Sequence, residues 1–117
     1  MNATRALVTK LARSRKESSI QAAVLGVFRA YGIVCWPQNR EKGGRNRAAH
    51  VGFKGLPDIG GVLPGGRAFF CEVKRPGELL TPHQLGTKEM LHQAGAYICC
   101  VHSAEEAHRA GRDATGR

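Results

Sequence analysis

Gly55-Leu-Pro-Asp-Ile-Gly-Gly-Val-Leu-Pro-Gly-Gly-Arg-Ala-Phe-Phe-Cys-Glu-Val-Lys74 contains two apolar runs separated by a Pro-Gly-Gly turn. Short apolar runs bounded by Gly and Pro are typical of strands, and a tight turn between them predicts an antiparallel hairpin. The first run begins at Asp58, and the second ends in Glu72 and Lys74, which share one face because strand side chains alternate. The hairpin therefore predicts that three charged side chains meet at one of its ends.

These three side chains are the ones that a metal-dependent phosphodiesterase site needs. Two adjacent carboxylates resist ionisation together, and a hard divalent cation such as Mg²⁺ removes that cost. We expect a metal ion held by Asp58, Glu72 and the main-chain carbonyl of Val73, with Lys74 positioning the attacking water or neutralising charge on the phosphate. Alternatively, an Asp after Pro is often a turn residue, and Glu-x-Lys on a strand is often a surface ion pair. The conjunction of the three charges with apolar surroundings favours the catalytic interpretation.

Four motifs in this order closely resemble the VRR-NUC family of the PD-(D/E)XK nuclease superfamily, over residues 17 to 107. They are Gly55-x-Pro-Asp58, Glu72-Val-Lys74-Arg-Pro-Gly77, Leu80-Thr-Pro-His-Gln84 and Gly95-Ala-Tyr-Ile-Cys-Cys-Val101. The resemblance implies a restriction-endonuclease-like core, dependence on Mg²⁺ or Mn²⁺, and hydrolysis of DNA phosphodiester bonds. It also implies a fourth acidic residue on the first helix and a Gln on a later one. Stand-alone members of the family look like structure-selective endonucleases of the Holliday-junction-resolving kind, often homodimers.

The first helix is expected over residues 17–31, where apolar residues recur at three- and four-residue steps and Gly32 follows. Glu17 borders the apolar stripe of this helix, so its carboxylate can point toward the metal. Glu17 could equally cap the helix or interact with its dipole. The resemblance favours Glu17 as a metal ligand.

Gln84 has two expected roles as well. Thr81 and Pro82 are typical of a helix start, which makes Gln84 the third helical residue and a candidate partner of Thr81 in a capping box. The family pattern instead places this side chain near the catalytic strand, close to the metal or the phosphate. Both roles are compatible, and we treat Gln84 as an auxiliary catalytic residue.

The expected fold is an α/β domain in the order αβββαβα, with helices flanking a mixed central sheet. The strands are expected at residues 33–36, 58–63, 68–74 and 96–101, and the later helices at about 82–94 and from Ser103 through Ala110. A helical crossover between the last two strands predicts parallel pairing there. We expect one nuclease domain at residues 14–110, a basic flexible segment at 1–13 and a flexible tail at 111–117.

Charge is unevenly distributed along the 117 residues, whose formal net charge is +9. Residues 1–55 contain eleven Lys or Arg and two acidic residues, whereas residues 56–117 contain seven of each. A basic surface attracts phosphate backbones, although a run of charge is also a common solvated face. The residues expected to contact DNA are Arg40, Lys42, Arg45, Arg47, Lys54 and Arg75. Aromatic residues are few and fall mainly in apolar runs, which argues against a base-stacking platform.

Cysteine spacing argues against zinc. The four cysteines contain no Cys-x-x-Cys pair, and the five histidines form no ligand pair on a helix. We expect the cysteines to be small core residues in a reducing compartment. No signal peptide or apolar span is visible, so a cytoplasmic protein with no membrane association is expected.

These observations predict a Mg²⁺- or Mn²⁺-dependent DNA endonuclease, structure-selective and homodimeric by resemblance. One alternative is a non-catalytic nucleic-acid-binding module on the same fold, although such a module gains nothing from carboxylates facing phosphate. The other is a hydrolase or transferase acting on a nucleotide-like small molecule, which would not need so many clustered cations.

Overall fold

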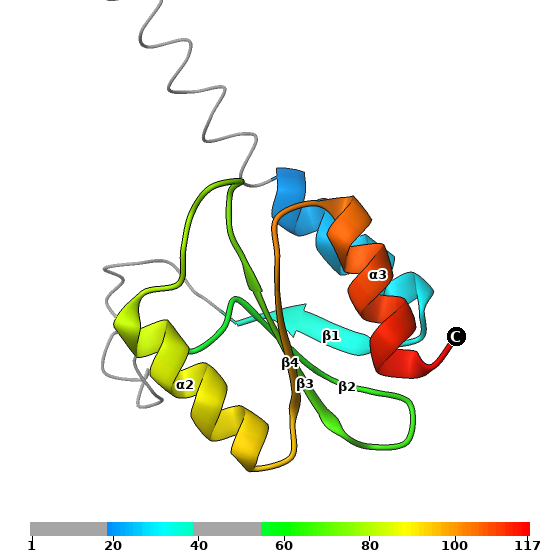
Figure 1. Cartoon of the computed structure of the whole chain (residues 1–117). Helices are drawn as coiled ribbons and strands as arrows, with labels where there is room; N and C mark the ends of the chain where they lie inside the picture. The colour runs from blue at the N-terminus through cyan, green and yellow to red at the C-terminus, as the bar shows by residue number, and fades with distance from the viewer. Residues whose placement is uncertain (1–18, 39–54) are drawn as a thin grey trace, which may run out of the picture.

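A computed structural model describes residues 19–38 and 55–117, and its arrangement is shown in Figure 1. The first helix is described over residues 19–30. It is followed by β1 (Val34–Pro37), β2 (Ile59–Val62), β3 (Ala68–Val73), α2 (Pro82–Gln93), β4 (Tyr97–Val101) and α3 (Ala104–Thr115). The predictions for the basic segment 1–13 and for Glu17, Arg40, Lys42, Arg45, Arg47 and Lys54 lie outside the described residues.

The four strands form one mixed sheet in the order β1-β2-β3-β4. β1 pairs with β2, and β2 with β3, in antiparallel fashion, whereas β3 and β4 are parallel. The α/β class, the hairpin and the helical crossover are thus confirmed. The expected strand ranges are one residue off at one or both ends. At two of those positions a single bond continues the pairing, because the Gln38 N–H donates to Asp58 O at 2.6 Å and the Lys74 N–H donates to Val101 O at 3.0 Å.

The core lies on one side of the sheet, which we call the core face, against the first helix and α3 (Figure 1). Phe28 of the first helix meets Phe69 of β3 edge to face, with ring centroids 4.8 Å apart, and Phe69 stacks on Tyr97 of β4 at 5.8 Å. Phe28 and Phe69 are fully buried. Burial of apolar surface here is the main source of stability.

The opposite side of the sheet faces α2, and we call it the site face (Figure 1). α2 packs against β4. Because side chains alternate along a strand, Phe70 and Glu72 point to the site face, whereas Phe69 and Cys71 point to the core face. The site face therefore carries the acidic residue of the β3 motif.

α3 is longer than expected. It continues to Thr115 and is closed by Gly116 in the left-handed conformation, with φ of 75°. The expectation of a flexible tail from Gly111 is therefore wrong for residues 111–115. Gly111 lies inside the helix and is buried beside Tyr31, where a Cβ atom would lie 2.7 Å from the ring, so the glycine is explained by close packing and not by a helix end.

No disulfide forms among the four cysteines, two of which are buried and two partly buried. Cys35, Cys71 and Cys99 have the expected role as small core residues. The expectation is wrong for Cys100, which pairs with Glu72 on the site face and lines the hollow beside it. Among the described residues, no helix combines the length and apolar character needed to cross a membrane.

Candidate active site

The β2–β3 hairpin brings Asp58 and Glu72 into contact. The register pairs Ile59 with Cys71, so the residues that flank this pair, Asp58 and Glu72, also lie opposite each other. The main-chain N–H of Asp58 donates to Glu72 Oε1 at 3.2 Å, and the N–H of Val73 donates to Asp58 Oδ2 at 2.9 Å. Each carboxylate thus accepts a bond from the backbone of the other strand, which fixes the position of both.

Gln84 joins the carboxylate pair to the start of α2. Its Nε2 donates to Glu72 Oε2 at 2.7 Å, while its Oε1 accepts from the main-chain N–H of Thr81 at 2.8 Å. The Gln84 N–H donates to Thr81 Oγ1 at 3.2 Å, which completes the capping box. Both expected roles of Gln84 therefore coexist in one side chain, and the cap orients the amide toward Glu72.

Glu72 is in an unfavourable electrostatic environment. The residue is only 7% exposed. Burial and the adjacent Asp58 carboxylate raise the pKa of Glu72 to about 8, while the Lys74 ammonium acts in the opposite direction. A buried carboxylate next to another carboxylate is costly unless a cation compensates. Lys74 supplies only part of that compensation.

The oxygen donors suit a hard cation. Within residues 19–38 and 55–117, no three Asp, Glu, His or Cys side chains gather closely enough to hold an ion. Asp58 and Glu72 supply two carboxylates, and Val73 follows Glu72 in the chain with a main-chain carbonyl. One or two carboxylates, with water and substrate phosphate at the remaining positions, are what Mg²⁺ usually binds in proteins. A cation here would also relieve the repulsion that raises the pKa of Glu72.

Two neighbours of the site were not singled out from sequence. Gln38, just after β1, donates through its main-chain N–H to Asp58 O and through Nε2 to Pro57 O at 3.1 Å, so it holds the chain that carries Asp58. Lys88 lies one helical turn after Gln84 and lines a small hollow together with Glu72 and Gln84. The four-residue step from Gln84 on a helix is the signal that places Lys88 on the same face.

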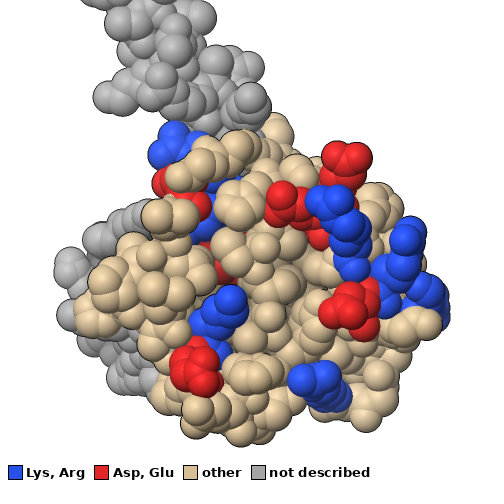
Figure 2. All heavy atoms as spheres, in the orientation of Figure 1, with Lys and Arg blue, Asp and Glu red and all other residues tan. Residues whose placement is uncertain are grey.

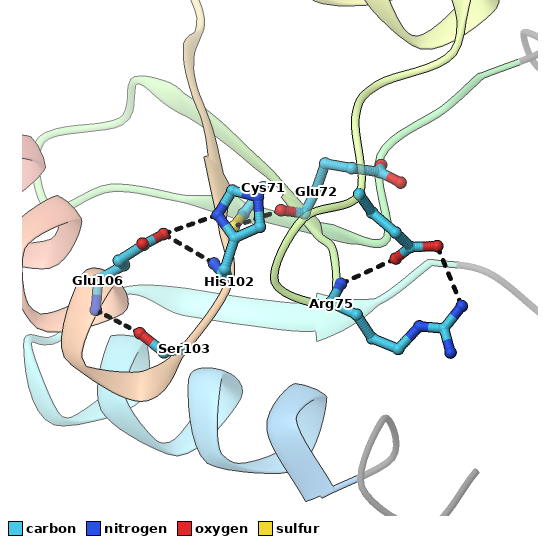
Figure 3. Close-up of polar contacts among 7 residues, drawn as sticks. Cys71, Glu72, Arg75, His102, Ser103 and Glu106 are labelled. Atoms are coloured by element: carbon cyan, nitrogen blue, oxygen red, sulfur yellow. Dashed lines mark hydrogen bonds and ion pairs between the residues drawn. The ribbon is translucent and has the colours of Figure 1, made fainter. Parts of the chain in front are cut away.

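The turn that follows β3 is held by Arg75. Its main-chain N–H donates to Glu78 Oε1 at 2.8 Å, and its Nη2 donates to Glu78 Oε2 at 3.3 Å, as the two dashed lines at Arg75 in Figure 3 show. These bonds lower the pKa of Glu78. Arg75 therefore has a structural partner, and its contact with DNA stays a prediction.

A second polar cluster in Figure 3 lies between the end of β4 and the start of α3. The Glu106 Oε1 atom accepts from the main-chain N–H of His102 at 2.8 Å and lies 2.9 Å from His102 Nδ1. The Glu106 N–H donates to the N-cap residue Ser103 at 3.1 Å. Ser103 caps α3 through its side-chain oxygen as Thr81 caps α2, but Glu106 accepts from the residue before the N-cap instead of from the N-cap itself, and the cluster bonds no carboxylate of the candidate site.

The described part of the chain holds little of the excess positive charge. Residues 19–38 and 55–117 contain eight Lys or Arg and seven Asp or Glu. In Figure 2 blue and red side chains are interspersed on the visible face rather than gathered by sign. Most of the basic excess consequently belongs to residues 1–18 and 39–54.

The similarity of this chain to known proteins is found among solved structures. No protein-family model matches the chain, and no curated protein matches it significantly. Solved structures do match, and two of them are described here. One, described as "VRR_NUC domain", has 28% sequence identity and a TM-score of 0.62, and the match covers 80% of this chain and 91% of that one. The other, described as "VRR_NUC domain protein", has 17% identity and a TM-score of 0.57, covers 84% and 86% of the two chains, and shows likeness of fold.

The fold of the first of these structures therefore extends over most of this chain. Asp58 and Glu72 lie in contact on the β2–β3 hairpin, and Gln84 reaches Glu72 from α2. The mixed sheet, the order of the motif residues and the likeness to these two structures show that the chain has the fold of a VRR-NUC domain, which is a nuclease-type domain.

Proposed function

We propose that this protein is an endonuclease that hydrolyses DNA phosphodiester bonds with Mg²⁺ or Mn²⁺. The observation that supports the proposal best is that main-chain hydrogen bonds hold the carboxylates of Asp58 and Glu72 next to each other. Two carboxylates in contact on a buried hairpin have no evident structural benefit. The nuclease-type domain makes phosphodiester hydrolysis the reaction class that fits this pair.

In this proposal Asp58, Glu72 and the carbonyl of Val73 hold the metal ion. When bound, the ion would supply Lewis-acid polarisation of the scissile phosphate and a water of lowered pKa. Gln84 keeps one oxygen of Glu72 fixed through its 2.7 Å bond. The Lys74 ammonium, on the same side of the hairpin, orients the attacking water or offsets negative charge that develops on the phosphate.

DNA is the proposed partner because of charge. The chain has a net charge of +9, concentrated before residue 56, and cations that neutralise phosphates make binding strongly salt-dependent. Arg40, Lys42, Arg45, Arg47, Lys54 and Arg75 are the proposed backbone contacts, and Glu17 is a proposed fourth ligand of the metal after Asp58, Glu72 and the carbonyl of Val73. By analogy with stand-alone relatives, we also propose selectivity for branched DNA and a homodimer. The four free cysteines fit a reducing compartment such as the cytoplasm.

The test is nicking of supercoiled plasmid by the purified protein with Mg²⁺, with Mn²⁺ and with EDTA. We expect nicking with either metal and none with EDTA. Asp58→Ala and Glu72→Ala should each lower the rate about a thousandfold or more. Glu105→Ala is the matched control, because Glu105 is an exposed carboxylate on α3, away from the hairpin.

A non-catalytic nucleic-acid-binding module is the second candidate. It would bind DNA with the same salt dependence but would nick nothing with either metal. Nicking that persists at full rate in both Asp58→Ala and Glu72→Ala would show that the cleavage comes from elsewhere and would refute the proposed site.

A further inference from the structure

Trp36 lies on the site face, in the row of side chains next to the carboxylates. The strand registers pair Trp36 with Gly60, Gly60 with Phe70, and Phe70 with Ile98. Paired residues point to the same side of a sheet, and Phe70 is two residues from Glu72, so Trp36 and Glu72 share the site face. Trp36 lies in an apolar run, as expected, but this run leaves the indole 44% exposed, so the argument against a base-stacking surface does not extend to Trp36.

Trp36 is also part of an exposed apolar patch. Val34 is 66% exposed, Trp36 44% and Val62 39%, and the register places Val34 directly opposite Val62. These three residues, which we call the β1 patch, are half of the large apolar residues that are exposed in the described part of the chain. Contiguous exposed apolar surface is more informative than scattered single residues, because it usually marks a binding surface.

The β1 patch is continuous with the candidate site. Two residues after Trp36, the main chain of Gln38 bonds Asp58 O at 2.6 Å. Two residues along a strand span about 7 Å. This is close to the separation of neighbouring nucleotides in an extended single strand, so a base on Trp36 would belong to a nucleotide next to the one whose phosphate reaches Asp58.

We propose that the indole of Trp36 stacks on one unpaired base of a nucleic acid whose backbone enters the candidate site. The position of the phosphate rests on the proposed function, whereas the stacking does not. Every base has a flat π-face, so an exposed aromatic side chain binds bases with little regard to sequence. A polyanion is the occupant that the charge of the chain favours, since most of the net charge of +9 belongs to residues 1–18 and 39–54, and the second of these segments follows Gln38 directly in sequence.

A second copy of the chain is a poorer occupant of the same surface. A stable protein interface buries roughly 800 Å² on each partner. The three partly exposed side chains of the β1 patch, on two short strands, offer a far smaller contact area. A single base, by contrast, is matched in size to one indole ring. Because bases inside a duplex are already stacked on each other, the β1 patch favours single-stranded, flapped or branched DNA over plain duplex.

The experiment uses the intrinsic fluorescence of the full-length protein, because Trp36 is the only tryptophan in the chain. A short oligothymidylate is titrated in EDTA, so that no cleavage is needed for the result. We expect saturable quenching by the single strand and little quenching by a duplex of equal length. This measurement on the unaltered protein does not depend on the folding of any variant.

Affinity is then compared between variants by the anisotropy of the labelled oligothymidylate. Loss of one stacked base should weaken binding of Trp36→Ala by about 5- to 150-fold. Trp36→Phe, which keeps an aromatic ring, should restore most of the affinity. Leu85→Ala is the matched control, since Leu85 is 52% exposed on α2, and it should bind as the unaltered protein does.

Three results would overturn the stacking proposal. The first is oligothymidylate binding by anisotropy without quenching, and the second is equal quenching by duplex. The third is fluorescence that changes with protein concentration alone while the mass in solution doubles, since a second copy would then cover Trp36. Metal-dependent plasmid nicking without quenching would reject only the stacking. Quenching without nicking would reject only the proposed enzyme.

Discussion

The two faces of the sheet are built from alternate residues of the same strands, yet they differ in what their side chains do. On the core face, Ile59, Phe69 and Cys71 have no exposed surface. On the site face, Glu72 is a buried acid with a raised pKa, and Trp36 is exposed. The difference teaches that neighbouring positions on one strand can have different roles. Side chains on the core face supply stability, and the site face can hold groups that cost stability.

Replacing neighbouring aromatic residues on β3 tests this separation with the largest expected effect on stability. Phe69→Ala removes a fully buried ring that contacts Phe28 and Tyr97, and should lower the free energy of unfolding by about 3–5 kcal/mol. Phe70→Ala, on the site face, removes a ring that is only half-buried and should cost clearly less. Urea unfolding followed by circular dichroism measures both. Equal losses would mean that the two faces contribute alike to stability.

Two adjacent glycines on β2, Gly60 on the site face and Gly61 on the core face, allow the same comparison of the two faces with a smaller expected loss of stability. A Cβ at Gly61 would meet the main-chain oxygen of Val34 and the Cβ of Cys35, neither of which can move away easily. A Cβ at Gly60 would lie 2.5 Å from Oε1 of Gln38, a side chain that can move away at the cost of its bond to Pro57 O. We expect Gly61→Ala to cost about 1–3 kcal/mol of stability and Gly60→Ala to cost less than about 1 kcal/mol. Thermal unfolding of the two variants measures their stability. A larger loss of stability for Gly60→Ala than for Gly61→Ala would contradict this prediction.

The hairpin, the mixed sheet and the contact of Asp58 with Glu72 were predictable because each depends on local rules. A turn between two apolar runs sets an antiparallel register, and the register decides which residues lie opposite each other. The Thr81–Gln84 cap was predictable for the same reason, since its spacing is fixed within one helical turn. The bond from Gln84 to Glu72 was expected only through the family resemblance.

Features that depend on contacts between distant segments were not predictable. Gly111 is typical of a helix end, but α3 continues to Thr115, and the glycine instead allows close packing against Tyr31. Trp36 belongs to an apolar run, and its exposure follows from α2 covering β4 rather than β1. Gln38 bonds Asp58 and Pro57 across the sheet, with no sequence motif to mark it. The roles of Glu17 and of the basic residues between 39 and 54 stay predictions.

The N-caps of α2 and α3 allow the comparison with the smallest expected change in stability, and only one of them is linked to the candidate site. Thr81 caps α2 on the site face, and Ser103 caps α3 on the core face, each through a side-chain oxygen that accepts an N–H three residues later. Thr81→Ala and Ser103→Ala should each cost about 1 kcal/mol in unfolding experiments.

Activity should separate the two cap variants, although their losses of stability are similar. When the cap of α2 is weakened, the first turn that carries Gln84 loosens, and Gln84 no longer holds Glu72 at 2.7 Å. Thr81→Ala should therefore slow plasmid nicking several-fold and require more Mg²⁺ for half-maximal rate, while Thr81→Ser restores both. Ser103→Ala should leave both unchanged, because Glu106 bonds His102 rather than a carboxylate of the site. If the two alanine variants nicked DNA equally well, Gln84 would be a capping residue only, and the link from the start of α2 to the candidate site would have no functional consequence.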